Sequence, residues 1–391
     1  DRRPSRGAGD VYKGKLRRST HLLFPPPPLA VQMPSAAPTL PLPLHPGCMD
    51  TRSPSLPRLS HASHSKSLSS HHTTAIHLGF FDTRPQVDFQ QYQRLVALVR
   101  HVEEEHATIV PHAILFFDPG IQLPDGFVLH NMQNLRVGAI EPDGRNRSGL
   151  ARCLYSNLMR LCHGPGRQNI WKPLLHLILP PTIDRILLLD TDLVVLKPLS
   201  RLWHAFREFG PSAVIGLGKE QTNMYEEGSG WKQSGRNGGV QLLHLRHMRA
   251  SSEYNSALDA YGRGELGRIG YLGDQTLYTV MASKWPALFH HVGCEWNRQI
   301  SPHFGFKNAT LHSCPKPCAI LHANDHRLKC IAAEMQTHLA SCKVWHDFVG
   351  NSVKQLPRPN VPTPSKCAFH DNNPHPFASA MRTFYWDCCL P

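Results

Sequence analysis

The pattern of hydrophobic and polar positions changes near residue 74. Beyond that point, short apolar runs alternate with segments in which apolar residues recur every three or four positions, as they do on one face of a helix. Helical spacing is found at residues 95–102, 150–161, 199–209 and 274–281. Apolar runs typical of short buried strands are found at residues 112–117, 185–189, 213–217, 240–245 and 319–322, and a further apolar run, 174–179, precedes Pro180-Pro181.

Alternating strands and helices predict an α/β fold with a central, mostly parallel sheet. Gly210 stands where a helix ending at Phe209 would have its C-cap, which supports the helix at residues 199–209. The length of this patterned region is enough for one large domain, which we expect to span residues 74–385.

Residues 1–73 have a different composition. They contain the proline run Pro25–Pro28 and a Ser/His-rich tract at residues 60–72. Such a segment buries too little apolar surface to offset the entropy of ordering it, so we expect a disordered arm rich in Pro, Ser and His. A polyproline ligand or a metal-binding His tract is the functional alternative for this arm.

Charge is concentrated in the same arm. The whole chain of 391 residues has a formal net charge of +13, and its first 70 residues hold ten Lys or Arg against three Asp, or +7 of that total. The remainder is only mildly basic, which argues against a nucleic-acid-binding protein. No run of 18 apolar residues is present. Because the chain begins with Asp1 rather than Met, we expect a membrane anchor upstream of Asp1.

The strongest chemical signal is Asp190-Thr-Asp192, which follows the apolar strand at residues 185–189. The chain bends where a strand ends, so both carboxylates can turn toward one point at the edge of the sheet where α/β proteins bind ligands. Two converging carboxylates repel each other unless a cation lies between them. The motif therefore indicates a divalent metal that binds a diphosphate; the structural alternative is a solvated turn.

A second class of enzyme shares this motif. Asp190-Thr-Asp192-Leu-Val194 also fits the nucleophile loop of haloacid-dehalogenase-like phosphohydrolases, in which Asp190 would be phosphorylated. That class needs a later pair of acidic residues, whereas Asp274 is followed by Gln275 and Thr276. The phosphohydrolase is therefore the weaker alternative.

The order of six segments resembles glycosyltransferase family 8, and most closely its glucoside xylosyltransferases and dystroglycan-modifying xylosyl/glucuronyl transferases, with glycogenin more distant. The segments are Lys172-Pro, Leu189-Asp-Thr-Asp192, Asn237-Gly-Gly-Val240, Gly273-Asp-Gln275, Cys294-Glu-Trp-Asn297 and Leu321-His-Ala-Asn324. The resemblance covers about residues 165–330. It implies a GT-A fold and a retaining transferase that moves a sugar, xylose being favoured, from a UDP-sugar to a hydroxyl of a glycan or glycoprotein.

The resemblance also implies roles for single residues. Asp190, Asp192 and His322 match the metal ligands, and an imidazole together with two carboxylates suits Mn²⁺ better than Mg²⁺. The donor-binding positions are Lys172, Asp190, Asn237 and Gly238, with Arg327 and Lys329 as candidates for a cation that contacts the β-phosphate. Asp274 and Gln275 match the segment that faces the sugar, where a carboxylate can stabilise positive charge at the anomeric carbon.

The cysteines and the N-glycosylation sequons give information on the cellular compartment. Cys294, Cys314 and Cys318 fall where related sequences also carry cysteines, and we interpret Cys294 as part of a structural disulfide. Two N-glycosylation sequons, Asn146-Arg-Ser148 and Asn308-Ala-Thr310, are weak support for a secretory route. The sequence therefore predicts an enzyme of the Golgi or secretory-pathway lumen, membrane-anchored and using no nucleic acid, with a non-catalytic sugar-binding relative as the remaining alternative.

Overall fold

A computed structural model describes residues 74–82, 89–103, 107–116, 123, 125–132, 154, 167–221, 235–266, 273–299, 314, 316–324, 332–333 and 336. All of them belong to one compact unit of the chain. The expected arm, both sequons, Arg327, Lys329 and all but Leu154 of the helix expected at residues 150–161 lie outside the described residues. The domain bounds 74–385 therefore stay a prediction.

The described elements are β1 (Thr74–Asp82), α1 (Phe89–Val102), β2 (Ala107–Leu115), β3 (Val128–Asn131), η2 (Arg167–Leu174), α3 (Leu175–Ile178), β4 (Ile186–Leu189), β5 (Leu193–Val195), α4 (Leu199–His204), η3 (Ala205–Arg207), β6 (Ile215–Lys219), β7 (Arg236–Leu243), α5 (Leu245–Ala250), α6 (Ser252–Gly262), α7 (Asp274–Lys284), η5 (Pro286–Leu288), β8 (Phe289–His291), η6 (Cys294–Trp296), β9 (Arg298–Gln299) and β10 (Ile320–His322). Among the described residues, no helix is long and apolar enough to cross a bilayer.

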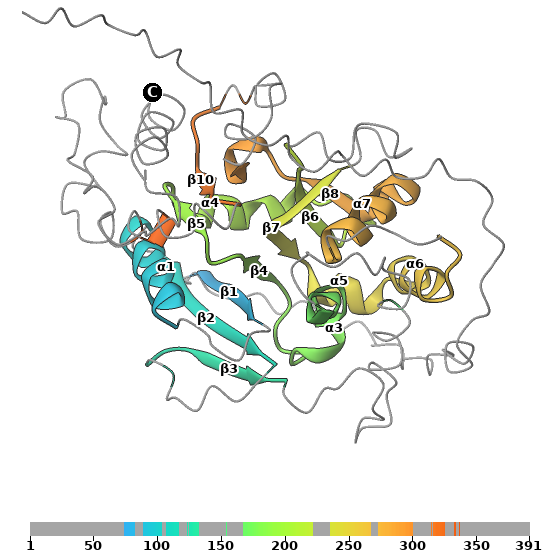
Figure 1. Cartoon of the computed structure of the whole chain (residues 1–391), viewed down its shortest axis with the longest axis horizontal. Helices are drawn as coiled ribbons and strands as arrows, with labels where there is room; N and C mark the ends of the chain where they lie inside the picture. The colour runs from blue at the N-terminus through green and yellow to red at the C-terminus, as the bar shows by residue number, and fades with distance from the viewer. Residues whose placement is uncertain are drawn as a thin grey trace, which may run out of the picture. The chain divides into compact units, whose positions relative to one another are not determined.

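Seven strands form the main sheet in the order β3-β2-β1-β4-β7-β6-β8 (Figure 1). The pairs β3–β2, β2–β1, β1–β4 and β6–β8 are parallel, whereas β7 runs antiparallel to both of its neighbours. The expectation of a mostly parallel α/β sheet is therefore confirmed.

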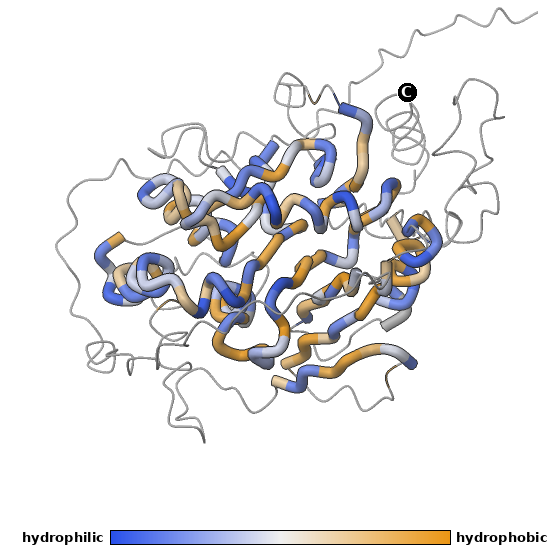
Figure 2. The backbone as a smooth tube through the Cα atoms, turned by 180° about the vertical axis from the view of Figure 1, so that it is seen from behind, coloured by the Kyte–Doolittle hydropathy of each residue, from blue (hydrophilic) through white to orange (hydrophobic). Residues whose placement is uncertain are grey.

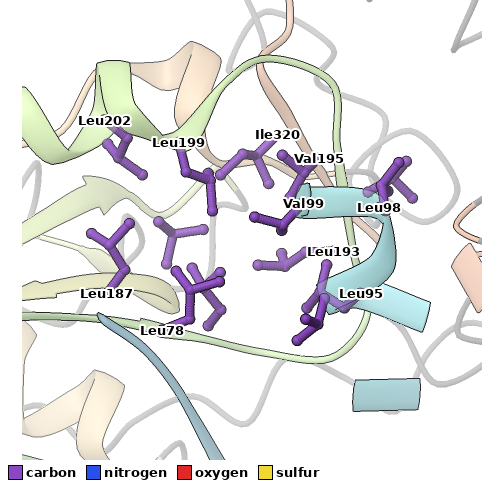
Figure 3. Packing of buried hydrophobic residues seen from close by; sticks show 14 of the residues in the cluster. Leu78, Leu95, Leu98, Val99, Leu187, Leu193, Val195, Leu199, Leu202 and Ile320 are labelled. Atoms are coloured by element: carbon purple, nitrogen blue, oxygen red, sulfur yellow. The ribbon is translucent and has the colours of Figure 1, made fainter. Parts of the chain in front are cut away.

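Both faces of this sheet are covered, and β4 shows why its sequence is apolar throughout. Leu187 and Leu189 point into one hydrophobic cluster, shared with α1, α4 and β5, while Ile186 and Leu188 point into a second cluster, shared with α3, α5, α6 and α7. A strand buried on both faces reads as a continuous hydrophobic run rather than an alternating one. Figure 2 shows the hydrophobic positions along the strands, and Figure 3 shows the first cluster, with α1, β5, α4 and β10 converging on β1 and β4.

A second, three-stranded sheet lies in the order β5-β10-β9. β10 pairs antiparallel with β5, placing His322 opposite Leu193, and parallel with β9, placing His322 opposite Gln299. Because β5 begins directly after Asp192, this small sheet brings the end of β10 next to the aspartate motif. It thereby joins parts of the chain that are distant in sequence.

Most expected elements are present with shifted ends. α1, β4, α4 with η3, α7 and β10 occur where the apolar patterns predicted them, and β2 begins at Ala107, before the expected residue 112. β7 begins at Arg236 rather than at Val240, so the Asn237–Gly239 segment lies inside a strand and not before it. Glycine has low strand propensity, and the strand is evident only from its partners. Asn237 pairs with Gly218 of β6, and the Gly239 carbonyl accepts a hydrogen bond from Asp190 N–H.

Candidate functional site

The two aspartates of the Asp190-Thr-Asp192 motif lie in the turn between β4 and β5. Backbone hydrogen bonds fix both ends of this turn: Asp190 N–H donates to the Gly239 carbonyl (2.9 Å), and Ala323 N–H donates to the Asp192 carbonyl (2.9 Å). The Asp190 side chain is 41% exposed, whereas that of Asp192 is 7% exposed. The motif therefore has one carboxylate open to solvent and one inside the protein.

His322, at the end of β10, completes a three-residue cluster with these aspartates. Its Nε2 lies 3.5 Å from Asp192 Oδ1 and 3.9 Å from Asp190 Oδ2, and one ligand atom from each residue lies within 4.8 Å of the others. Two ligands of one ion, each bound at about 2.1–2.4 Å, are at most about 4.2–4.8 Å apart. The donor set and its spacing therefore fit a divalent cation, and the structure brings together the three residues that were predicted as ligands.

Gly239 forms one wall of this cluster. A Cβ atom at this position would overlap the His322 ring, lying 2.6 Å from Nδ1 and 2.7 Å from Nε2. Glycine is therefore required by the close approach of β7 to the imidazole, whatever the backbone angles.

Lys172 lies in η2, between the cluster and Asp274. Its Nζ is 3.4 Å from Asp190 Oδ1 and 3.8 Å from Asp274 Oδ2, and the residue is only 6% exposed. Burial by itself lowers the pKa of the Lys172 ammonium, but Asp190 and Asp274 outweigh it, so this pKa is raised. Lys172 is thus held as a cation between the metal-binding motif and the second buried carboxylate.

Asp274 and Gln275 form the first turn of α7. The preceding residue, Gly273, has a φ of 58°, a left-handed conformation that favours glycine and turns the chain into the helix. Asp274 Oδ2 accepts a hydrogen bond from Gln241 Nε2 (3.0 Å), and burial raises the pKa of this carboxyl although Lys172 opposes the shift. Gln275 Oε1 accepts from Gly238 N–H (3.2 Å), which brings the predicted Asn-Gly and Asp-Gln segments together.

Two further residues of this region were not singled out from the sequence. Glu220, just after β6, accepts hydrogen bonds from Asn237 Nδ2 (2.9 Å) and Gln275 Nε2 (2.8 Å). Asn297, just before β9, contacts His322 Nδ1 through Oδ1 (2.9 Å). Asn297 was part of a quoted motif but had no role assigned to it, whereas nothing local marked Glu220.

A disulfide joins Cys294 and Cys314 near β9, which confirms the interpretation of Cys294. Cys318 is buried and unpaired. The disulfide ties η6, and through it Asn297, to the segment that leads into β10. The predicted phosphate-binding candidates, Arg327 and Lys329, lie outside the described residues.

Comparison with known proteins finds relatives that are all named as xylosyltransferases or as xylosyl- and glucuronyltransferases. The chain is 33% identical to mouse (Mus musculus) xyloside xylosyltransferase 1 over 147 residues, which are 32% of this chain and 37% of that protein. It is 30% identical to the mouse xylosyl- and glucuronyltransferase LARGE2 over 150 residues, covering 36% of this chain and 22% of that protein. The chain thus spans at most 37% of the length of these relatives. No protein-family model matches the chain.

The fold also has a counterpart among solved structures. The crystal structure of apo mouse xyloside xylosyltransferase 1 superimposes with a TM-score of 0.51 at 22% sequence identity, covering 64% of this chain and 98% of that one. The chain is therefore a homologue of the xylosyl- and glucuronyltransferases, and the sheet and helices described above form a GT-A fold.

Proposed function

We propose that this homologue of xylosyl- and glucuronyltransferases is itself a Mn²⁺-dependent transferase, which moves a sugar from a UDP-sugar to a hydroxyl of a glycan or glycoprotein, with retention at the anomeric carbon. Xylose is the favoured sugar, because it appears in the names of all the relatives described above. The observation that carries the proposal is the convergence of Asp190, Asp192 and His322 beside the buried Lys172 and Asp274.

In this proposal, Asp190, Asp192 and His322 hold the cation. Two hard carboxylates and one softer imidazole nitrogen suit Mn²⁺ better than Mg²⁺. The ion offsets the negative charge that develops on the leaving diphosphate. Asp190, with its partly exposed carboxylate, is the ligand best placed to face a nucleotide arriving from solvent.

The neighbouring residues form the donor-sugar pocket. Asn237 and Gly238 line it from β7, and Asp274 and Gln275 line it from the start of α7. Lys172 opposes the rise that burial causes in the pKa of Asp274, whose carboxylate can hold sugar hydroxyls and stabilise positive charge at the anomeric carbon. No separate nucleophile is assigned, and we infer attack by the acceptor hydroxyl on the same face of the sugar that the diphosphate leaves. Normal kcat in Asp274→Ala would contradict this role for Asp274.

The Cys294–Cys314 disulfide supports an oxidising compartment, and we propose the Golgi or secretory-pathway lumen. Anchoring in the membrane and a catalytic domain spanning residues 74–385 belong to the same proposal.

The decisive experiment measures UDP release from a panel of UDP-sugars, with Mn²⁺ and with EDTA. The wild type is expected to use one sugar in a Mn²⁺-dependent manner, and Asp192→Ala to abolish that activity. Asp184→Ala is the matched control, because Asp184 precedes the same strand but is 46% exposed and paired with Arg246. Absence of both turnover and Mn²⁺-dependent UDP binding in the wild type would refute the proposal. An acid-labile phosphoenzyme on Asp190 would instead identify a phosphohydrolase.

A further inference from the structure

A continuous chain of side-chain hydrogen bonds connects His322 to Glu220, on the side of the imidazole opposite the aspartates. His322 Nδ1 lies 2.9 Å from Asn297 Oδ1, Asn297 Nδ2 donates to Asn237 Oδ1 (2.9 Å), and Asn237 Nδ2 donates to Glu220 Oε2 (2.9 Å). His322, Asn297 and Asn237 are each at most 3% exposed. We refer to these four residues as the Glu220–His322 relay.

The chemistry of the groups determines the direction of each hydrogen bond in the relay. Gly239 N–H can only donate, so the Asn237 atom 3.0 Å from it must be the oxygen, and the Asn237 nitrogen must face Glu220. That oxygen can only accept, so Asn297 must present its nitrogen to Asn237 and its oxygen to His322. An amide oxygen can only accept as well, and His322 Nδ1 must therefore carry the proton.

This protonation leaves His322 Nε2 as the nitrogen that faces Asp190 and Asp192. A neutral imidazole with hydrogen on Nδ1 has its lone pair on Nε2, which is the form that binds a metal. The opposite tautomer would direct the Nδ1 lone pair at the Asn297 oxygen only 2.9 Å away. Without that oxygen, the two nearby carboxylates would draw the proton onto Nε2 and block it as a ligand.

We propose that Glu220, Asn237 and Asn297 are positioning residues that hold His322 in the Nδ1–H tautomer, with Nε2 available to a divalent cation. The relevance to catalysis rests on the proposed function, whereas the hydrogen bonds that select the tautomer are present without a metal ion. The same Glu220 oxygen accepts a hydrogen bond from Gln275 Nε2 (2.8 Å). The Glu220 carboxylate therefore orients both Asn237, which leads to the metal cluster, and Gln275, in the proposed sugar pocket.

The test is the tautomer of His322, read from two-bond ¹H–¹⁵N correlations of ¹⁵N-histidine-labelled protein without metal. Spectra are recorded at about pH 9, where an ordinary imidazole is neutral, and the His322 signals are identified by their loss in His322→Asn. The wild type is expected to show Nδ1–H. Asn297→Leu removes the acceptor and is expected to show Nε2–H, while Asn297→Asp keeps an acceptor oxygen and is expected to keep Nδ1–H.

Gln299→Leu is the matched control, because Gln299 is as deeply buried as Asn297 and lies opposite His322 in the sheet, but its side chain accepts from Gln221 N–H and donates to the Lys219 carbonyl instead. It is expected to keep Nδ1–H. In the same proteins, Mn²⁺ affinity at saturating UDP, measured from the free-ion signal in electron paramagnetic resonance, is expected to fall about 10- to 100-fold in Asn297→Leu only.

An Nε2–H ring in the wild type or in Asn297→Asp would overturn the inference, as would an Nδ1–H ring in Asn297→Leu. These wild-type and Asn297→Asp spectra test it even if Asn297→Leu does not fold. The expected tautomers in a protein that binds no Mn²⁺ would support the relay and refute the proposed function.

Discussion

The α-carbon of Gly239 faces the ring of His322 so closely that there is no room for a side chain between them. The contact joins β7 to β10, and the Gly239 carbonyl also accepts a hydrogen bond from Asp190 N–H. One glycine thus sets the position of an aspartate on one side and of the imidazole on the other.

In the proposed transferase, Gly239→Ala is therefore expected to displace His322 and to weaken Mn²⁺-dependent UDP binding at least tenfold, a change of about 1.4 kcal/mol or more. Gly210→Ala is the control, because no atom lies within 4 Å of a Cβ added at that position. Titration calorimetry compares the two variants. Equal UDP affinity in both would mean that His322 can move without consequence for binding.

Lys172→Met is expected to destabilise the fold by about 3–5 kcal/mol at neutral pH, because it leaves Asp274 buried without its cation. Burial already raises the pKa of Asp274, and loss of Lys172 raises it further. An acid whose pKa is higher in the folded than in the unfolded state destabilises the fold at high pH and ceases to do so once it is protonated.

The loss in Lys172→Met should therefore shrink as the pH falls, which urea unfolding at several pH values would measure. Arg263→Met removes an ion pair with Glu265 in which both side chains are exposed, and is expected to change little. A loss that does not depend on pH would show that Lys172 stabilises through packing alone.

Three histidines on neighbouring strands predict acid sensitivity. His77 Nδ1 lies 2.8 Å from His112 Nε2, and His112 Nδ1 lies 2.9 Å from His130 Nε2. Burial, and then the neighbouring His130 and His77, lower the pKa of His112 from 6.5 to about 3. Below pH 6.5 the unfolded chain binds a proton at His112 that the folded chain does not. The free energy of unfolding therefore decreases as the pH decreases, by about 1.4 kcal/mol per pH unit for this residue.

His112→Gln is expected to flatten the dependence of unfolding free energy on pH by that amount between pH 6 and 5, since glutamine can donate and accept but does not titrate. His204→Gln, at an exposed position on α4, is the control and should leave the slope unchanged. The same slope in both variants would exclude His112 as the cause.

The Cys294–Cys314 disulfide closes a loop across 20 positions and is expected to contribute about 3 kcal/mol by restricting the unfolded chain. Either Cys294→Ser or Cys314→Ser should lose this amount, and the double variant should lose little more, because the bond is already broken. Urea unfolding gives the three values. Additive losses would show that the cysteines stabilise the fold separately.

Much of the fold could be predicted because its signals are local. β4 is apolar throughout because both of its faces are buried, and the two aspartates mark its end without ambiguity. α7 was also predicted, although the residues from Thr276 to Ala282 are all buried and form no single apolar face. β1 was not predicted, although Ile76, Leu78 and Phe80 alternate as they do in a strand; its central position depends on its pairing with β2 and β4.

The candidate site was only partly predictable, because contacts between residues distant in the sequence leave no local signal. His322 is one of 26 histidines and was selected through family resemblance rather than through any local pattern. Glu220 and Asn297 belong to the site because both form hydrogen bonds with Asn237. Glu220 lies 17 positions from Asn237 in the sequence, and Asn297 lies 60 positions from it. No periodicity encodes contacts of this kind, because they arise only when β6, β7 and β9 have come together.

The pairing of β5 with β10 has a consequence for biosynthesis. Asp192 and His322 are 130 positions apart, so a nascent chain that has not yet produced residue 322 contains both aspartates but lacks the third donor. An ion held by all three residues binds only the completed fold and stabilises it, by about 2.7 kcal/mol at a hundredfold excess over its dissociation constant. If the proposed function is right, manganese starvation should lower the amount of folded protein in the cell as well as its catalytic rate.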